Sequence, residues 1–164
     1  MDSDELITQV DEYDNVIGLR PRSEFEEGKL IHRSSYLLVL SAKNQILLHR
    51  RPLSKKWYPG KWTFAIAGSV TDETYEECIR RQTREAFGKE IKFKELFKYQ
   101  HFDNVDKAFK TVFLVHLEDQ DLSVGKNYVW ISLDKLKNEM AQNPEKYAPP
   151  FVTGIKIAFN QKLI

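Results

Sequence analysis

The chain has 164 residues, of which 41% are hydrophobic and 12% aromatic, so it can fill the core of one domain but is too short for a multidomain protein. Its 25 lysine and arginine residues nearly balance 24 aspartate and glutamate residues, and the net charge is +1. This balance excludes a general basic field for nucleic acid and an acidic excess typical of disorder. We therefore predict a single domain over residues 1–164, in which any charged site is local.

The cysteine content, the N-terminal residues and the lengths of the apolar segments predict the cellular compartment of the protein. One cysteine, Cys78, excludes an internal disulfide framework and fits a reducing compartment. Residues 1–5 are acidic and lack the basic and apolar regions of a signal peptide. The longest strongly apolar run, residues 36–40, is far below the roughly 20 residues that a spanning helix needs. We expect a cytoplasmic protein without membrane or nucleic-acid partners, and the sequence does not indicate its oligomeric state.

The first half of the chain predicts a hairpin, two central strands, a loop and a further strand. Apolar residues flank Asp14 and Asn15, a pair that favours a turn, so we expect an N-terminal hairpin. Two more apolar segments predict a central hairpin, and a segment rich in proline and glycine predicts a loop before the next strand. These four segments are residues 36–40, 46–48, 50–60 and 62–66. Gly68 is expected to end the last strand.

From Thr74 the spacing of apolar residues becomes that of a helix. The residues on its apolar face are Cys78, Ile79, Thr83, Ala86 and Phe87. Charged residues occupy the other face, and Gly88 is a typical helix end. The pattern predicts one amphipathic helix between Thr74 and Gly88.

The second half of the chain predicts three strands and two helices. The strands are expected at residues 91–101, 108–117 and 128–131. One helix is expected from near Ser132 to Pro144, and the pair Pro149 and Pro150 opens a packed C-terminal helix. Strands mixed with segregated helices predict a layered α/β or α+β domain.

A cluster of basic residues lies in the predicted loop and just beyond it. Its members are Arg50, Arg51, Lys55, Lys56 and Lys61. Guanidinium groups make forked contacts and ammonium groups act as point charges, a combination that suits a diphosphate. A solvated surface loop fits the same composition. The cluster therefore predicts a local anion site, with an ordinary basic loop as the alternative.

Charged residues of the predicted helix follow a spacing of four. Glu77, Arg81 and Glu85 succeed one another at this spacing. Surface ion pairs, each worth about 0.2–0.5 kcal/mol, are a sufficient structural explanation. The order of elements favours a functional one, because a strand, a turn at Gly68 and Glu73 lead directly into the charged helix.

Residues 68–88 resemble the signature of the Nudix hydrolase family, in which a glycine and a glutamate precede a helix with arginine, several glutamates and a closing glycine. The matching residues are Gly68, Glu73, Arg81, Glu85 and Gly88, with the glycine turn one residue short. Gln82 and Ala86 stand where the family has two of its three metal-binding glutamates, so the motif is degenerate. The resemblance implies an α/β Nudix fold, in which a mixed β-sheet is sandwiched between helices (α/β/α).

The resemblance narrows to the isopentenyl diphosphate isomerase branch of the Nudix fold and extends over most of the chain. The residues that carry it are His32, segments 50–56 and 59–63, and Arg80 with Arg81. Ala67 replaces the isomerase cysteine, Ser69 a metal-binding histidine, and Ala108 lies near its catalytic glutamate position. A methyl group cannot transfer a proton, so we do not expect isomerase activity. A lone histidine is more often structural than a metal ligand, which is how we interpret His32.

The resemblance implies a hydrolase that cleaves a diphosphate linkage in a small molecule with Mg²⁺ or Mn²⁺. Glu85 and Glu73 would be the catalytic and metal-binding residues, and Arg51, Lys55 and Arg81 would bind the substrate. Mg²⁺ can be held by one or two carboxylates when phosphates and waters complete its shell, so binding would be weak and substrate-dependent. The alternative is a catalytically inactive module that binds a diphosphate ligand or a protein partner.

The remaining aromatic and polar candidates are interpreted as structural. Trp57, Tyr58 and Trp62 favour a pocket wall or core over a stacking surface for a ligand. His101 and Asp103 follow a predicted strand and favour a polar loop cluster over a general base.

Overall fold

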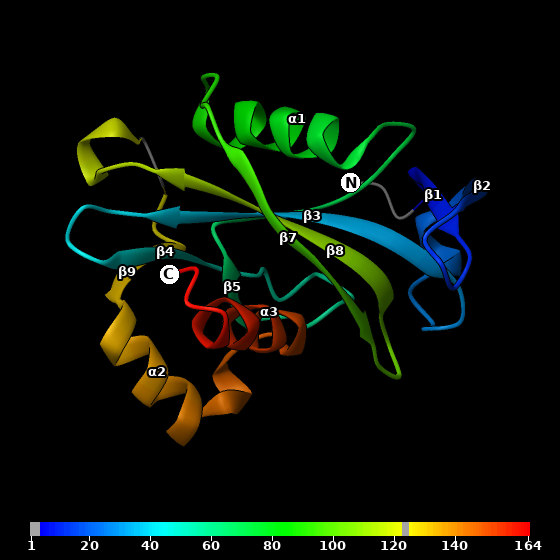
Figure 1. Cartoon of the computed structure of the whole chain (residues 1–164). Helices are drawn as coiled ribbons and strands as arrows, with labels where there is room; N and C mark the ends of the chain where they lie inside the picture. The colour runs from blue at the N-terminus through cyan, green and yellow to red at the C-terminus, as the bar shows by residue number, and fades with distance from the viewer. Residues whose placement is uncertain (1–3, 123–124) are drawn as a thin grey trace.

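The computed structural model describes residues 4–122 and 125–164, which form a mixed sheet of nine strands with helices on both faces (Figure 1). The strands are β1 (Leu6–Val10), β2 (Val16–Pro21), β3 (Ile31–Leu40), β4 (Gln45–Arg50), β5 (Trp62–Phe64), β6 (Ile66–Ser69), β7 (Lys94–Phe102), β8 (Lys107–His116) and β9 (Tyr128–Ser132). The α-helices are α1 (Tyr75–Phe87), α2 (Leu133–Gln142) and α3 (Pro149–Asn160). Short 3₁₀ turns are η1 (Arg22–Glu24), η2 (Asp119–Asp121) and η3 (Pro144–Lys146).

Strand β3 is the centre of the sheet. It pairs in parallel with β8 along its whole length, from Ile31 opposite Lys107 to Leu40 opposite His116. It also pairs antiparallel with β1, β4 and β6. The parallel pairing brings the beginnings of β3 and β8 to the same edge of the sheet, although they lie far apart in the sequence.

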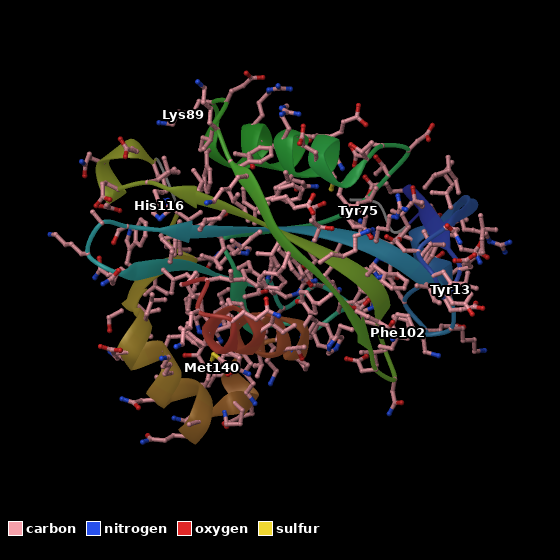
Figure 2. The ribbon with its side chains drawn as sticks, in the orientation of Figure 1. Tyr13, Tyr75, Lys89, Phe102, His116 and Met140 are labelled. Carbon is pink, nitrogen blue, oxygen red and sulfur yellow. The ribbon has the colours of Figure 1, made fainter. Side chains whose placement is uncertain are left out.

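Each face of the sheet has its own apolar core, because side chains alternate along a strand. Leu37 and Val39 of β3 belong to one cluster with Ile79 of α1. Leu38 belongs to the opposite cluster, with Phe151 of α3. Figure 2 shows Tyr75 of α1 on one side of the sheet and Met140 of α2 on the other. The predicted α/β/α sandwich is confirmed. No helix among the described residues is long and apolar enough to span a membrane.

Helix α1 begins and ends as predicted. The Thr74 side chain accepts a hydrogen bond from the Glu77 amide, and the Glu77 carboxylate accepts one from the Thr74 amide, which completes a capping box. Gly88 adopts the left-handed conformation at φ 73°, which a glycine accommodates without strain. Ala86 is exposed, so its predicted place on the buried face is wrong. The buried face of α1 is therefore narrower than the spacing of its apolar residues predicted.

Two strand predictions differ from the structure. The strand expected at residues 62–66 is two strands, because β5 pairs with β4 whereas β6 pairs with β3, and the chain changes partner at Ala65. Gly68 lies inside β6 and does not end it. The other predicted strands and helices are present within a few residues of their expected limits.

The N-terminal hairpin is fixed to the rest of the fold through Asp14. Its carboxylate accepts hydrogen bonds from Arg33 Nε at 2.7 Å, Tyr75 Oη at 3.0 Å and Lys98 Nζ at 2.7 Å. These donors come from β3, α1 and β7. One turn residue thus joins the hairpin to three elements of the sheet and helix layers.

We predict that Gly154→Ala destabilises the packing of α3 on the sheet. A Cβ at this position would lie 2.8 Å from Tyr99 Oη, and the Tyr99 hydroxyl is held by its hydrogen bond to the Pro150 carbonyl. The free energy of unfolding should fall by about 1–3 kcal/mol, as measured by urea denaturation. Gly18→Ala is the control, since a Cβ there meets nothing within 4 Å. Equal stability of the two variants would contradict the prediction.

Candidate active site

A cleft of about 810 Å³ lies between the loop that joins β4 to β5, the exposed side of α1 and the beginnings of β3 and β8. Residues from all four elements line it, and those used below are His32, Ser34, Tyr36, Arg51, Lys55, Trp57, Arg81, Gln82, Glu85, Asp106 and Lys110. Four of the five predicted site residues, Glu85, Arg51, Lys55 and Arg81, are therefore brought together, whereas Glu73 lies behind Arg81.

The basic loop contributes two cations, Arg51 and Lys55, to a cleft whose lining also includes Glu5 and Glu26, and these two carboxylates attract Lys55. Among the described residues, neither Arg51 nor Lys55 lies within salt-bridge distance of a carboxylate. Burial lowers the pKa of Arg51. Burial also lowers the pKa of Lys55, and repulsion from Arg51 and Arg22 adds to this effect. An anion bound here would stabilise the charged form of both side chains.

Trp57 holds the basic loop against the body of the protein. Its ring stacks on His32, with centroids 4.7 Å apart and planes 4° apart. Its Nε1 donates to the Val105 carbonyl at 2.8 Å, and its own carbonyl accepts from Arg51 Nε at 2.6 Å. The Tyr58 hydroxyl donates to Asp103 in the same β7–β8 turn. Trp57 is buried and belongs to the wall, as predicted.

Asp106 joins a histidine and a lysine beneath the cleft. Its carboxylate oxygens lie 2.6 Å from His32 Nε2 and 2.8 Å from Lys110 Nζ, and Lys110 also lies 3.4 Å from Ser34 Oγ. All four residues are buried. Burial opposes the charge of Asp106, but Lys110 and His32 hold its pKa far below the usual value. Asp106 in turn raises the pKa of Lys110 against the effect of burial, whereas burial lowers the pKa of His32.

Sequence reasoning missed Asp106 and Lys110, although a signal for the lysine exists. Lys110 lies two residues from Ala108 and two residues from Val112 in β8, so all three side chains are on the same side of the strand. Ala108 and Val112 are both buried. A lysine on the buried side of an apolar strand requires a partner or a function. Asp106 lies four residues earlier, but its contact with His32 depends on the pairing of β8 with β3. That pairing joins distant parts of the chain.

On α1, the guanidinium group of Arg81 forms an ion pair with the Glu73 carboxylate. Arg81 Nε and Nη2 donate to the two oxygens of Glu73 at 3.0 and 2.6 Å, and the Thr71 amide donates to the same carboxylate. Burial opposes ionisation of Glu73, but these hydrogen bonds outweigh it and lower the pKa of Glu73. Glu85 lies 3.8 Å from Arg81 Nη1, and its side chain is 63% exposed. Arg81 therefore links the two carboxylates.

Comparison with known proteins assigns the chain to a family. The model of the NUDIX domain matches residues 30–151, which include the basic loop, α1 and most of the residues that line the cleft. The chain belongs to the Nudix family.

Relatives and solved structures agree with this assignment. A prenyl-diphosphate phosphatase of Methanosarcina mazei is 35% identical, over 95% of this chain and 96% of its own. An isopentenyl-diphosphate Delta-isomerase of Serratia proteamaculans is 25% identical, over 93% and 90%. The NUDIX domain of Shewanella oneidensis NrtR, crystallised with ADP ribose, has a TM-score of 0.61 at 15% identity and covers 83% of this chain, which covers 90% of that structure. That structural likeness concerns the fold.

The Nudix helix of this chain offers few ligands for a divalent cation. Gln82 lies against Gly68, where a Cβ would be only 2.7 Å from Gln82 Cγ, and Ala86 carries no donor atom. In the described part of the chain, no group of three or more histidine, cysteine, aspartate or glutamate residues could hold a metal ion. Glu85 is the carboxylate of α1 that reaches the cleft. The residues fit a cation that shares its shell with substrate phosphates.

We predict that stability falls as pH decreases below about 6.5 because of His32, which is buried, and His49, which is partly buried. Burial lowers the pKa of His32 and of His49 from 6.5, so the unfolded chain takes up protons at a higher pH than the folded chain. Above that pH the contribution of both histidines is fully present. His32→Gln removes one of these groups and should reduce the loss of unfolding free energy between about pH 7 and pH 5. His116→Gln, at an exposed position, is the control in urea denaturation at each pH.

Proposed function

We propose that this Nudix protein hydrolyses the diphosphate group of a small prenyl diphosphate, using a divalent cation such as Mg²⁺ or Mn²⁺. The observation that carries the proposal is that Arg51 and Lys55, neither of which forms an ion pair among the described residues, share one cleft with the Glu85 carboxylate. The chemistry of the Methanosarcina mazei relative supports a prenyl substrate. Tyr36, Trp57 and other apolar lining residues suit a hydrocarbon group.

The roles of the basic residues follow from their chemistry. Arg51 offers the guanidinium nitrogens that the Trp57 carbonyl does not use, and these can make forked contacts with phosphate oxygens. Lys55 adds a mobile point charge at the exposed rim. Both stabilise the negative charge that a diphosphate brings into the cleft.

The acidic residues act together through Arg81. Glu85 would hold the cation, with phosphate oxygens and waters as its other ligands. A divalent cation neutralises a diphosphate and orients a water for attack at phosphorus. Glu73 positions Arg81 by its two hydrogen bonds, and Arg81 restrains Glu85 from 3.8 Å. Glu73 is thus a positioning residue in this proposal.

We predict that Glu85→Gln abolishes most of the hydrolysis. The change keeps the shape of the side chain but removes the charge that holds the cation, so turnover should fall by about 100-fold or more, beyond the usual cost of losing an outer-shell partner. Phosphate release from dimethylallyl and geranyl diphosphate, with Mg²⁺, Mn²⁺ or a chelator, measures it. Glu76→Gln, an exposed change on the same helix, is the control. Unchanged turnover in Glu85→Gln would refute the role of Glu85.

The same assay separates hydrolysis from the alternative of a binding module. The replacements at Gln82 and Ala86 favour that alternative, because they remove negative charge from the helix that faces the cleft. If the natural chain releases no phosphate with either cation, while pyrophosphate raises its melting temperature, the binding module is the correct assignment.

We predict that Arg51→Met weakens substrate binding more than turnover. Loss of a charge-assisted hydrogen bond should raise KM by about tenfold to a hundredfold, with a smaller change in kcat. Arg50→Met is the matched control, because Arg50 is exposed and donates to the Gly60 carbonyl. Steady-state kinetics with the prenyl substrates provides the measurement, and equal KM values for the two variants would contradict the role of Arg51.

A further inference from the structure

Lys110 is a buried charge that neither the family motif nor the proposed mechanism uses. It lines the cleft from β8, and its side chain is only 2% exposed. Replacing a buried ion pair by apolar residues often leaves stability unchanged or raises it. Stability is therefore a weak reason for a lysine at this position, and its place in the lining of the cleft points to a functional reason.

The ammonium group of Lys110 has one strong acceptor among its contacts. Asp106 Oδ2 accepts one strong hydrogen bond at 2.8 Å, and Ser34 Oγ lies at the long distance of 3.4 Å. The ring of Tyr36 lies beside the group, 5.3 Å from Nζ to the centroid, and the Tyr36 side chain also interacts with it through its hydroxyl. An ammonium group has three donors, and a single carboxylate, itself shared with His32, faces this one. A phosphate oxygen would be a stronger acceptor than the Ser34 hydroxyl.

The reduced negative charge of α1, on the other side of the cleft, indicates a role for Lys110. Gln82 and Ala86 occupy two positions of the Nudix motif at which glutamates hold cations. A chain that recruits less metal needs another source of positive charge for a diphosphate. Lys110, although paired with Asp106, places N–H donors at the floor of the cleft, while Arg51 and Lys55 carry positive charge at its rim.

We propose that Lys110 is a substrate-contacting residue, whose ammonium group binds a phosphate oxygen at the floor of the cleft without a metal ion. Asp106, held by His32, positions it for this contact. The inference rests on the proposed function in one respect, namely that the ligand carries a diphosphate. It differs from that proposal in requiring neither Glu85 nor turnover.

The test is the binding of inorganic pyrophosphate in the presence of EDTA, followed by calorimetry. Lys110→Met with Asp106→Asn removes both buried charges together, so no unpaired charge is left in the core. We expect the natural chain to bind pyrophosphate and the double variant to bind it about tenfold or more weakly. Lys146→Met with Glu139→Gln removes an ion pair on α2 and η3 and is the matched control. Equal affinity of both double variants would overturn the proposal, as would binding by the natural chain only with Mg²⁺.

A second measurement covers the case in which the double variant does not fold. The NMR signal of the Lys110 ammonium group in the natural chain should shift when pyrophosphate is added with EDTA, and the signal of Lys146 should not. A Lys110 signal that stays unchanged at saturation would also overturn the proposal. Failure of the proposed function has a different signature, because absent phosphate release leaves these binding results intact.

Discussion

The ion pair between Asp106 and Lys110 is the interaction on which the cleft depends. Removing one partner from such a buried pair typically costs about 3–5 kcal/mol, because a charge is left without compensation. Asp106 also bonds to His32, which stacks on Trp57, and the Trp57 carbonyl accepts from Arg51. Consecutive contacts thus run from the floor of the cleft to the guanidinium group at its rim.

The sheet topology makes this series of contacts possible. The parallel pairing of β3 and β8 places His32 directly opposite Ala108, next to the turn that carries Asp106. That turn also accepts the indole N–H of Trp57 through the Val105 carbonyl. A loop with two prolines and a glycine would otherwise be mobile, but here Trp57 holds it, and with it Arg51, at one end of a rigid sheet. Position, and not only composition, brings the basic residues together in one cleft.

Local patterns predicted more of the fold than of the site. Helix α1 could be located closely because Thr74, Glu77 and Gly88 are signals that act within one or two turns of the chain. The basic residues Arg51 and Lys55 could be found from composition. The partner change at Ala65 and the contact of Asp106 with His32 could not, because both depend on which strands become neighbours. No periodicity within a single segment carries that information.

The distribution of charged side chains around the cleft has a consequence for ligand binding. In a metal-centred site, several carboxylates attract a cation before the substrate arrives. Here the cleft is lined by Arg51 and Lys55 together with Glu5, Glu26 and Glu85, while Arg81 is paired with Glu73 and Lys110 with Asp106. Coulomb attraction at short range in a partly dry cleft is strong, so cations without an ion-pair partner, such as Arg51 and Lys55, would attract an anion. Under the proposed function, a diphosphate would enter together with its cation, and Glu85 would act as a ligand in the ternary complex.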